Sequence, residues 1–159
     1  MIGLHFEELD IGRVIGIGNY TFTADNISRF SRTFVPVSFH LDSGEAEKGL
    51  FGGTAAAGFH TCCAWMICFV TCNDDARKAL AATGMPVPEP GPSPGVQDIR
   101  WPRPVHPGDV VSFRNTITDK RELASRPQWG MITMLSEGHN QRGELVMSFS
   151  GKVLVARKG

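Results

Sequence analysis

The feature of this sequence that most constrains its fold is a long stretch without charged side chains. From Gly49 to Asn73 there is no Asp, Glu, Lys or Arg, and the part TAAAGFHTCCAWMICFVTC has about the length of a membrane span. It is only mildly apolar, however, and no basic cluster flanks it. A helix that is apolar on all sides is instead predicted to lie buried inside a soluble domain. We expect it to end near Asn73 and Asp74.

Two further elements are predicted before this helix. Residues 11–22 mix β-branched and aromatic residues with glycines, which indicates a strand that bends near Gly16 and Gly18. The apolar residues of 24–34 recur at helical spacing, and Thr23 is a suitable N-cap for that amphipathic helix.

The rest of the chain predicts a sheet. Ser43 is a suitable cap for one or two helical turns that end at Gly49, and the proline-rich residues 84–95 are predicted to form a surface crossing loop. Four runs with turns at HPGD and NQRG are predicted to form an antiparallel meander: VQDIRW, DVVSFRNTITD, GMITMLSEGHN and ELVMSFSGKVLVA. Together these elements predict one α+β domain over residues 1–159, in which a twisted antiparallel sheet wraps a long central apolar helix.

Charge and cysteine usage exclude several classes of partner. Sixteen basic and sixteen acidic residues cancel and are scattered, so neither nucleic acid nor a membrane is expected as a partner. The first residues do not resemble a secretory signal, and a cytoplasmic location is expected.

The four cysteines lie between Cys62 and Cys72, which predicts reduced, buried thiols. No metal site is expected, because nothing completes a set of four ligands.

Two local patterns, one in each half of the chain, make the fold more specific. The first is FVPVSFHLDSGEAEKGLFGGTAAAG, and its informative positions are His40, Asp42, Ala46, Phe51 and Gly58. The second is IRWPRPVHPGD, which ends in Pro104, Val105, Gly108 and Asp109 with the spacing P-V-x-x-G-D. Both resemble signatures of the MaoC-like dehydratases, or (R)-specific enoyl-CoA hydratases, in the same order along the chain. The resemblance covers nearly the whole chain and implies a hot-dog fold.

This resemblance implies addition of water to a trans-2-enoyl thioester, or the reverse dehydration, without a cofactor. His40 matches the family's catalytic histidine. Gly58 matches the glycine whose backbone N–H faces the thioester oxygen, and the start of an apolar helix adds the positive end of the helix dipole. Phe51, Gly52 and His60 are the expected substrate-binding residues, although His60 fits a core position equally well. An acyl-CoA or related thioester and a second copy of the chain, in a homodimer or higher oligomer, are the expected partners.

One position departs from the family. Five residues before the histidine the family has an aspartate that shares the water with it, and here that residue is Val35; Val37 and Ser38 also differ. A general base contributes about 10²–10⁴-fold in rate, and valine supplies none of it. Asp42 is a candidate substitute, although it more readily caps the next short helix. Three functions stay open: a hydratase that uses His40, an acyl-CoA-binding protein that has lost its base, and a hot-dog thioesterase.

Overall fold

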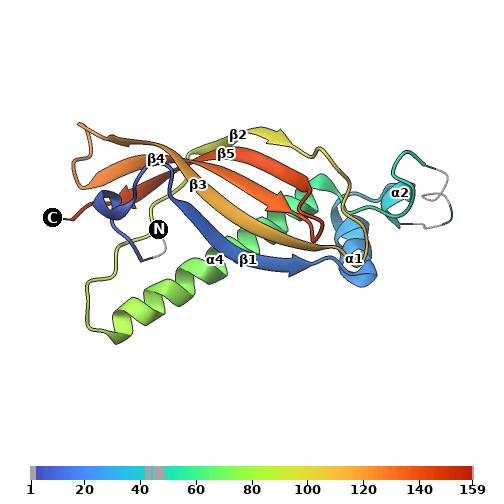
Figure 1. The fold of residues 1–159 in the computed structure, drawn as a ribbon, viewed down its shortest axis with the longest axis horizontal. Coiled ribbons are helices and arrows are strands. Elements are labelled where there is room, and N and C mark those ends of the chain that lie inside the picture. The colour runs from blue at the N-terminus through green and yellow to red at the C-terminus, as the bar shows by residue number, and fades with distance from the viewer. Residues whose placement is uncertain (1–2, 42–43, 45–48, 159) are drawn as a thin grey trace.

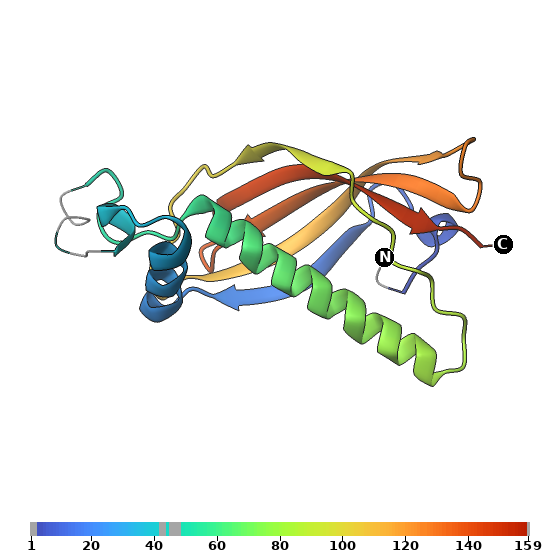
Figure 2. The ribbon, with the colours of Figure 1, turned by 180° about the vertical axis from the view of Figure 1, so that it is seen from behind.

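The computed structural model describes residues 3–41, 44 and 49–158. In chain order its elements are η1 (Phe6–Glu8), β1 (Val14–Thr21), α1 (Ala24–Phe34), α2 (Ser38–Leu41), α4 (Gly58–Ala82), β2 (Gly95–Arg100), β3 (Val110–Glu122), β4 (Trp129–His139) and β5 (Leu145–Ala156). The strands form one antiparallel sheet that curves along one side of α4 (Figures 1 and 2). The predicted α+β architecture is therefore confirmed. Asp42, Ala46 and most of the helix predicted at 43–49 lie outside the described residues.

The strand order differs in one respect from a simple meander. The order is β1-β3-β4-β5-β2, so the meander is confirmed for β3, β4 and β5, but β2 pairs with β5 at the far edge of the sheet. The crossing loop after α4 passes over β5, where Pro90 forms a bridge to Val155. As a result β2 lies at the edge of the sheet, next to β5. The following strand, β3, pairs with β1 on the other side of the sheet, and Thr21 faces Val110 in that pair.

The central helix is longer than predicted. It begins at Gly58 as expected, but it continues past Asn73 and Asp74 to Ala82, so the predicted end was wrong. The added turns are rich in alanine, arginine, lysine and leucine, which favour helix without needing burial. Figure 2 shows these turns projecting away from the sheet.

The part of the chain that the structure describes buries only one face of α4. Trp65 lies on that face, where its indole N–H donates to Asn115 Oδ1 at 3.0 Å and its ring meets Phe149 edge-on at 4.8 Å. On the opposite face three apolar side chains are 47–60% exposed and line up along the helix: Phe59, Met66 and Val70. We call these three residues the α4 stripe. The prediction of a helix buried on all sides was therefore wrong for the single chain, because the sheet covers one face only.

The four cysteines of α4 also differ in burial between its covered and uncovered faces. All four thiols are free; Cys68 is buried, Cys62 and Cys72 are half-buried, and Cys63 is exposed. The prediction of buried thiols thus holds for Cys68 alone, because α4 has an uncovered face. In the described part of the chain, no helix combines the length and the apolar character needed to cross a membrane.

Candidate active site

His40 is held in one orientation by a backbone carbonyl. It lies on α2, is 8% exposed, and its Nδ1 is 2.6 Å from the carbonyl oxygen of Ala55. A carbonyl oxygen can only accept a hydrogen bond, so Nδ1 carries the proton in the neutral imidazole. The lone pair then lies on Nε2, the nitrogen that can take a proton from a water molecule.

Aromatic rings extend from His40 toward the residues predicted to bind substrate. The Phe39 ring lies 4.5 Å from the His40 ring and 5.7 Å from the Phe51 ring, measured between centroids. Phe51 is 41% exposed. Gly52 follows it with φ at 65°, and no atom of the described residues lies within 4 Å of the position where a Cβ would stand. Phe51 and Gly52 thus form an open rim beside the histidine.

The second sequence pattern holds the segment that leads into α4. The carbonyl oxygen of Val105 accepts a hydrogen bond from the Ala56 N–H at 2.8 Å, and Nδ1 of His106 lies 2.9 Å from the carbonyl oxygen of Thr54. Together with the bond from His40 to the intervening residue, three contacts fix three consecutive residues. These contacts set where the helix begins at Gly58. Sequence reasoning missed His106 in this role.

Asp109, at the end of the same pattern, stabilises the turn that carries His106. Its carboxylate accepts hydrogen bonds from the His106 backbone N–H at 2.9 Å and from Gln141 Nε2 at 2.8 Å, and it pairs with Arg142 at 3.4 Å. Burial by itself would raise the pKa of Asp109, but these bonds and the nearby charge outweigh it and hold the pKa below its usual value. Asp109 therefore stays ionised at neutral pH and acts as a structural anion.

The first turn of α4 leaves a backbone donor free. Ala57 at the N-cap offers no side-chain cap, and its carbonyl oxygen accepts from the N–H groups of His60 and Thr61. Among the described residues the Gly58 N–H has no acceptor. An unpaired N–H at the positive end of a 25-residue helix is suited to a carbonyl oxygen that gains negative charge.

Trp101 packs directly on Gly58. A Cβ at position 58 would lie 2.5 Å from two ring atoms of the indole, so only glycine lets the ring approach this closely. The same ring meets Phe59 edge-on at 5.4 Å and is itself 41% exposed. Sequence reasoning missed this contact. The available signal was the position of Trp101 inside the second pattern.

Val35 ends α1 and brings no charge to the site. It is half-buried, and its N–H donates to the carbonyl oxygen of Ser31 at 2.9 Å. Within the described residues no carboxylate bonds to the His40 ring, and Asp42 falls outside them. The described site therefore combines a histidine, a helix start and aromatic walls, without a second base.

His60 lies apart from His40, on the side of α4 that faces α1. Its ring stacks on Phe30 with centroids 4.5 Å apart and planes 3° apart, and it meets Phe22 edge-on at 5.0 Å. Burial lowers the pKa of His60 to about 4, so the ring is neutral at neutral pH. His40, Phe51 and Gly52 gather beside the segment that precedes Gly58, whereas His60 lines a separate cavity between α1 and α4.

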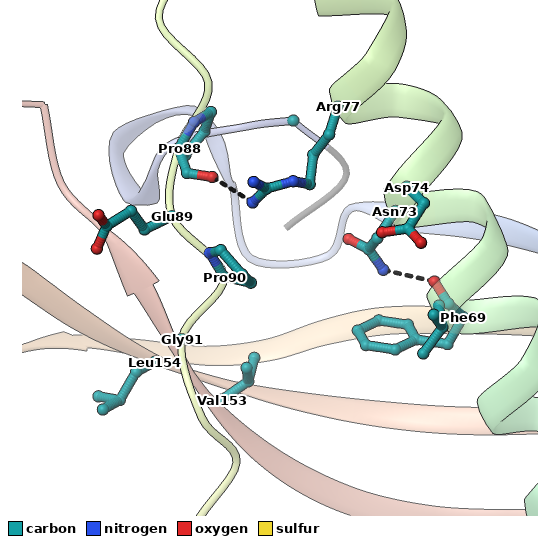
Figure 3. Close-up of a pocket in the computed structure, with 12 residues that line it drawn as sticks. Phe69, Asn73, Asp74, Arg77, Pro88, Glu89, Pro90, Gly91, Val153 and Leu154 are labelled. Carbon is teal, nitrogen blue, oxygen red and sulfur yellow. Dashed lines mark hydrogen bonds between the residues drawn. The ribbon is translucent and has the colours of Figure 1, made fainter.

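Another cavity lies farther along α4, against the crossing loop. It has a volume of about 340 Å³, and none of the predicted site residues lines it. Figure 3 shows Phe69 on one wall and Arg77 reaching across to the carbonyl oxygen of Pro88, to which it donates a hydrogen bond of 2.7 Å. Phe69 follows Gly58 by eleven residues, roughly 16 Å of helix. This cavity is therefore separate from the candidate site.

The sequence and the structure were compared with known proteins. The sequence matches the family model described as FAS1-like, dehydratase domain region, over residues 10–149. The structure is similar to that of a MaoC-like dehydratase from Rhodospirillum rubrum, with a TM-score of 0.78, 31% sequence identity and 99% of each chain covered. It is also similar to a Mycobacterium tuberculosis protein with a double hot-dog fold, with a TM-score of 0.70 and 17% identity, covering 99% of this chain and 45% of that one. The hot-dog fold is thereby confirmed.

A curated enzyme matches over a shorter segment. Mesaconyl-CoA hydratase from Haloarcula marismortui is 31% identical over 65 residues. That segment is 40% of this chain and only 18% of the length of the enzyme.

Proposed function

Because this chain belongs to the FAS1-like dehydratase-region family and has the hot-dog fold of a MaoC-like dehydratase, we propose that it hydrates a trans-2-enoyl thioester or catalyses the reverse dehydration. The observation that carries the proposal is the short bond between His40 and Ala55, which leaves Nε2 as a base at the edge of the helix start. The substrate is an acyl-CoA or a related thioester, and Phe51 and Gly52 line its path.

In hydration, Nε2 of His40 takes a proton from water while the water oxygen bonds to the β-carbon. The electron pair of the double bond moves to the α-carbon, and negative charge spreads onto the thioester oxygen. The Gly58 N–H, supported by the helix dipole, stabilises that charge. The α-carbon then takes a proton, and the protonated His40 is the described group best placed to return one.

Incubation with a short enoyl-CoA, such as crotonyl-CoA, tests this function. A 3-hydroxyacyl-CoA product supports hydration. Free thiol would instead indicate a thioesterase, and tight binding without turnover would indicate a binding protein. The absence of a carboxylate partner for His40 among the described residues favours this last alternative over the thioesterase.

Restoring a carboxylate at position 35 should raise turnover. We expect Val35→Asp to increase kcat on crotonyl-CoA by roughly 10-fold or more, because even a partly positioned base recovers part of the 10²–10⁴-fold range. Val35 is only half-buried, so the new charge keeps some contact with water and the fold should tolerate it. Steady-state kinetics and a thermal unfolding curve measure both effects.

Ala24→Asp is the matched control, because it adds the same charge at the other end of α1. Ala24 is exposed and is the first residue of that helix. We expect it to leave kcat within about twofold of wild type, since a surface change away from the water has little effect. Robust wild-type turnover that falls in Val35→Asp would mean that another group serves as the base.

The protein is also proposed to form a homodimer or a higher homo-oligomer. Pairing of sheet edges is a weak reason for this, because edge strand β2 carries an irregularity at Asp98, whose φ is 56°, and this discourages simple edge pairing. The α4 stripe provides a better reason, because it exposes Phe59, Met66 and Val70 together. A second copy of the chain that covers the stripe would complete the burial of the central helix.

Sedimentation velocity at micromolar concentration should give at least the mass of a dimer. Met66→Glu, which places a charge in the α4 stripe, should shift the protein toward monomer, whereas Thr71→Glu at an exposed polar position of the same helix should not. A wild-type protein that sediments as a monomer contradicts the proposal.

A further inference from the structure

The cavity between α1 and α4 has a buried histidine in its wall. Its volume is about 350 Å³, within the range of small-ligand pockets, and its walls come from β1, α1 and α4. The aromatic rings of Tyr20, Phe30 and Phe34 line it together with His60. We call it the α1–α4 cavity. Such walls suit a flat, apolar body.

His60 has a nitrogen that the protein does not satisfy. The residue is 4% exposed, and its Nδ1 is enclosed without a hydrogen-bond partner among the described residues. An enclosed lone pair is tolerated better than an enclosed N–H, so the proton belongs on Nε2. Nε2 is not among the enclosed atoms and has no protein acceptor in the described part of the chain. It is therefore a donor available to the cavity.

The other free polar groups of the α1–α4 cavity are also donors. Burial raises the pKa of Tyr20, so its hydroxyl keeps its proton and can donate a hydrogen bond. Arg29 supplies a positive charge, and its contact with Asp25 at 3.8 Å joins two highly exposed side chains and is weak. Asp25 does not line the cavity, and neither does any other carboxylate of the described residues. The cavity therefore favours an anion.

We propose that the α1–α4 cavity binds a carboxylate on a small, flat, apolar body, with His60 Nε2 and Arg29 as its donors. Two sources have this chemistry. One is a free carboxylic acid. The other is the free carboxylate of an acyl group whose thioester is bound at Gly58, and this source rests on the proposed hydratase function.

Benzoate is the probe for the first test, because it is a carboxylate on a flat apolar ring and its binding can be measured without any catalytic turnover. Titration at pH 7, followed by the ring nitrogen signals of His60 in NMR, should give a Kd of about 1 mM or tighter. Benzamide has the same shape without the charge and should bind at least about tenfold more weakly. Equal binding of the two probes, or no shift at His60, overturns the proposal.

Two variants separate the donors. Arg29→Gln should weaken benzoate binding about tenfold, the usual worth of one charge-assisted hydrogen bond. His60→Phe, which keeps the ring stacked on Phe30, should do the same. Arg32→Gln is the control on the same helix, because Arg32 donates to Ser28 and does not line the cavity. If Arg32→Gln weakens binding as much as Arg29→Gln, a general charge effect is responsible and the proposal fails.

Turnover then distinguishes the two sources. If the carboxylate belongs to the acyl group, Arg29→Gln should lower kcat/KM for mesaconyl-CoA about tenfold and leave crotonyl-CoA unchanged. If it belongs to a free acid, both thioesters should react equally well in wild type and variant, while benzoate binding is still weakened. Benzoate binding at His60 without turnover of either thioester contradicts the proposed hydratase and leaves the carboxylate site supported.

Discussion

Replacing His40 by alanine should lower the hydration of crotonyl-CoA by about 10²–10⁴-fold, because the variant loses the only base described at the site. The substitution also leaves the buried carbonyl oxygen of Ala55 without its donor, which costs about 1–3 kcal/mol of folding stability. His40→Asn separates these effects, since an asparagine amide can still donate to Ala55 but cannot act as a base. We expect both variants to show this loss of rate and His40→Asn to be the more stable one.

His139→Gln is the matched control for this pair. His139 ends β4, and among the described residues no hydrogen bond of its side chain links it to the candidate site. Its kcat should stay within about twofold of wild type. Retention of activity in a correctly folded His40→Asn protein would remove the histidine from the mechanism.

Gly58→Ala should lower turnover by on the order of 10²-fold, the usual effect of losing one oxyanion donor. The added methyl group would stand 2.5 Å from the Trp101 ring, so the ring or the start of α4 must move and the amide loses its position. Overpacking of this kind also costs about 1–3 kcal/mol in the free energy of unfolding. Kinetics on crotonyl-CoA and chemical denaturation measure the two effects.

A double variant tests the cause. Combining Gly58→Ala with Trp101→Ala removes the obstacle, so the stability loss should be smaller than the sum of the two single losses. Gly16→Ala is the control, because a Cβ there would have no described atom within 4 Å. If Gly58→Ala is as active and as stable as wild type, the packing of Trp101 on the helix start has no role in the reaction.

Several elements were predictable because local patterns specify them. Thr23 caps α1 through a bond from the Asn26 N–H at 3.1 Å, and the helix follows the spacing of its apolar residues. The strand at 11–22 is found as Val14–Thr21, with an irregularity between Gly16 and Gly18 where the glycines indicated one. In each case the signal lies in neighbouring residues of the sequence, although β1 itself pairs with the distant strand β3.

The end of α4 and the position of β2 were not predictable in this way. The charged residues after Asn73 are as compatible with an exposed helix as with a loop, and the helix continues because nothing nearby interrupts it before Gly84. β2 reaches the β5 edge because the crossing loop passes over β5, a route that depends on contacts with Val155 far along the chain. Local composition does not encode such routes.

By itself the sequence determined the fold class. It also determined the candidate site residues His40 and Gly58, and the uncharged residue Val35 at the position where the family has an aspartate. Only the tertiary structure decided what each of them faces. The Ala55 carbonyl sets which nitrogen of His40 carries the proton, Trp101 makes glycine necessary at position 58, and Phe30 of α1 stacks on the His60 ring. The Trp101 and α1 contacts join residues about thirty or more positions apart, and the Ala55 contact spans fifteen. Their distances depend on how whole elements pack, which no periodic pattern within one element specifies.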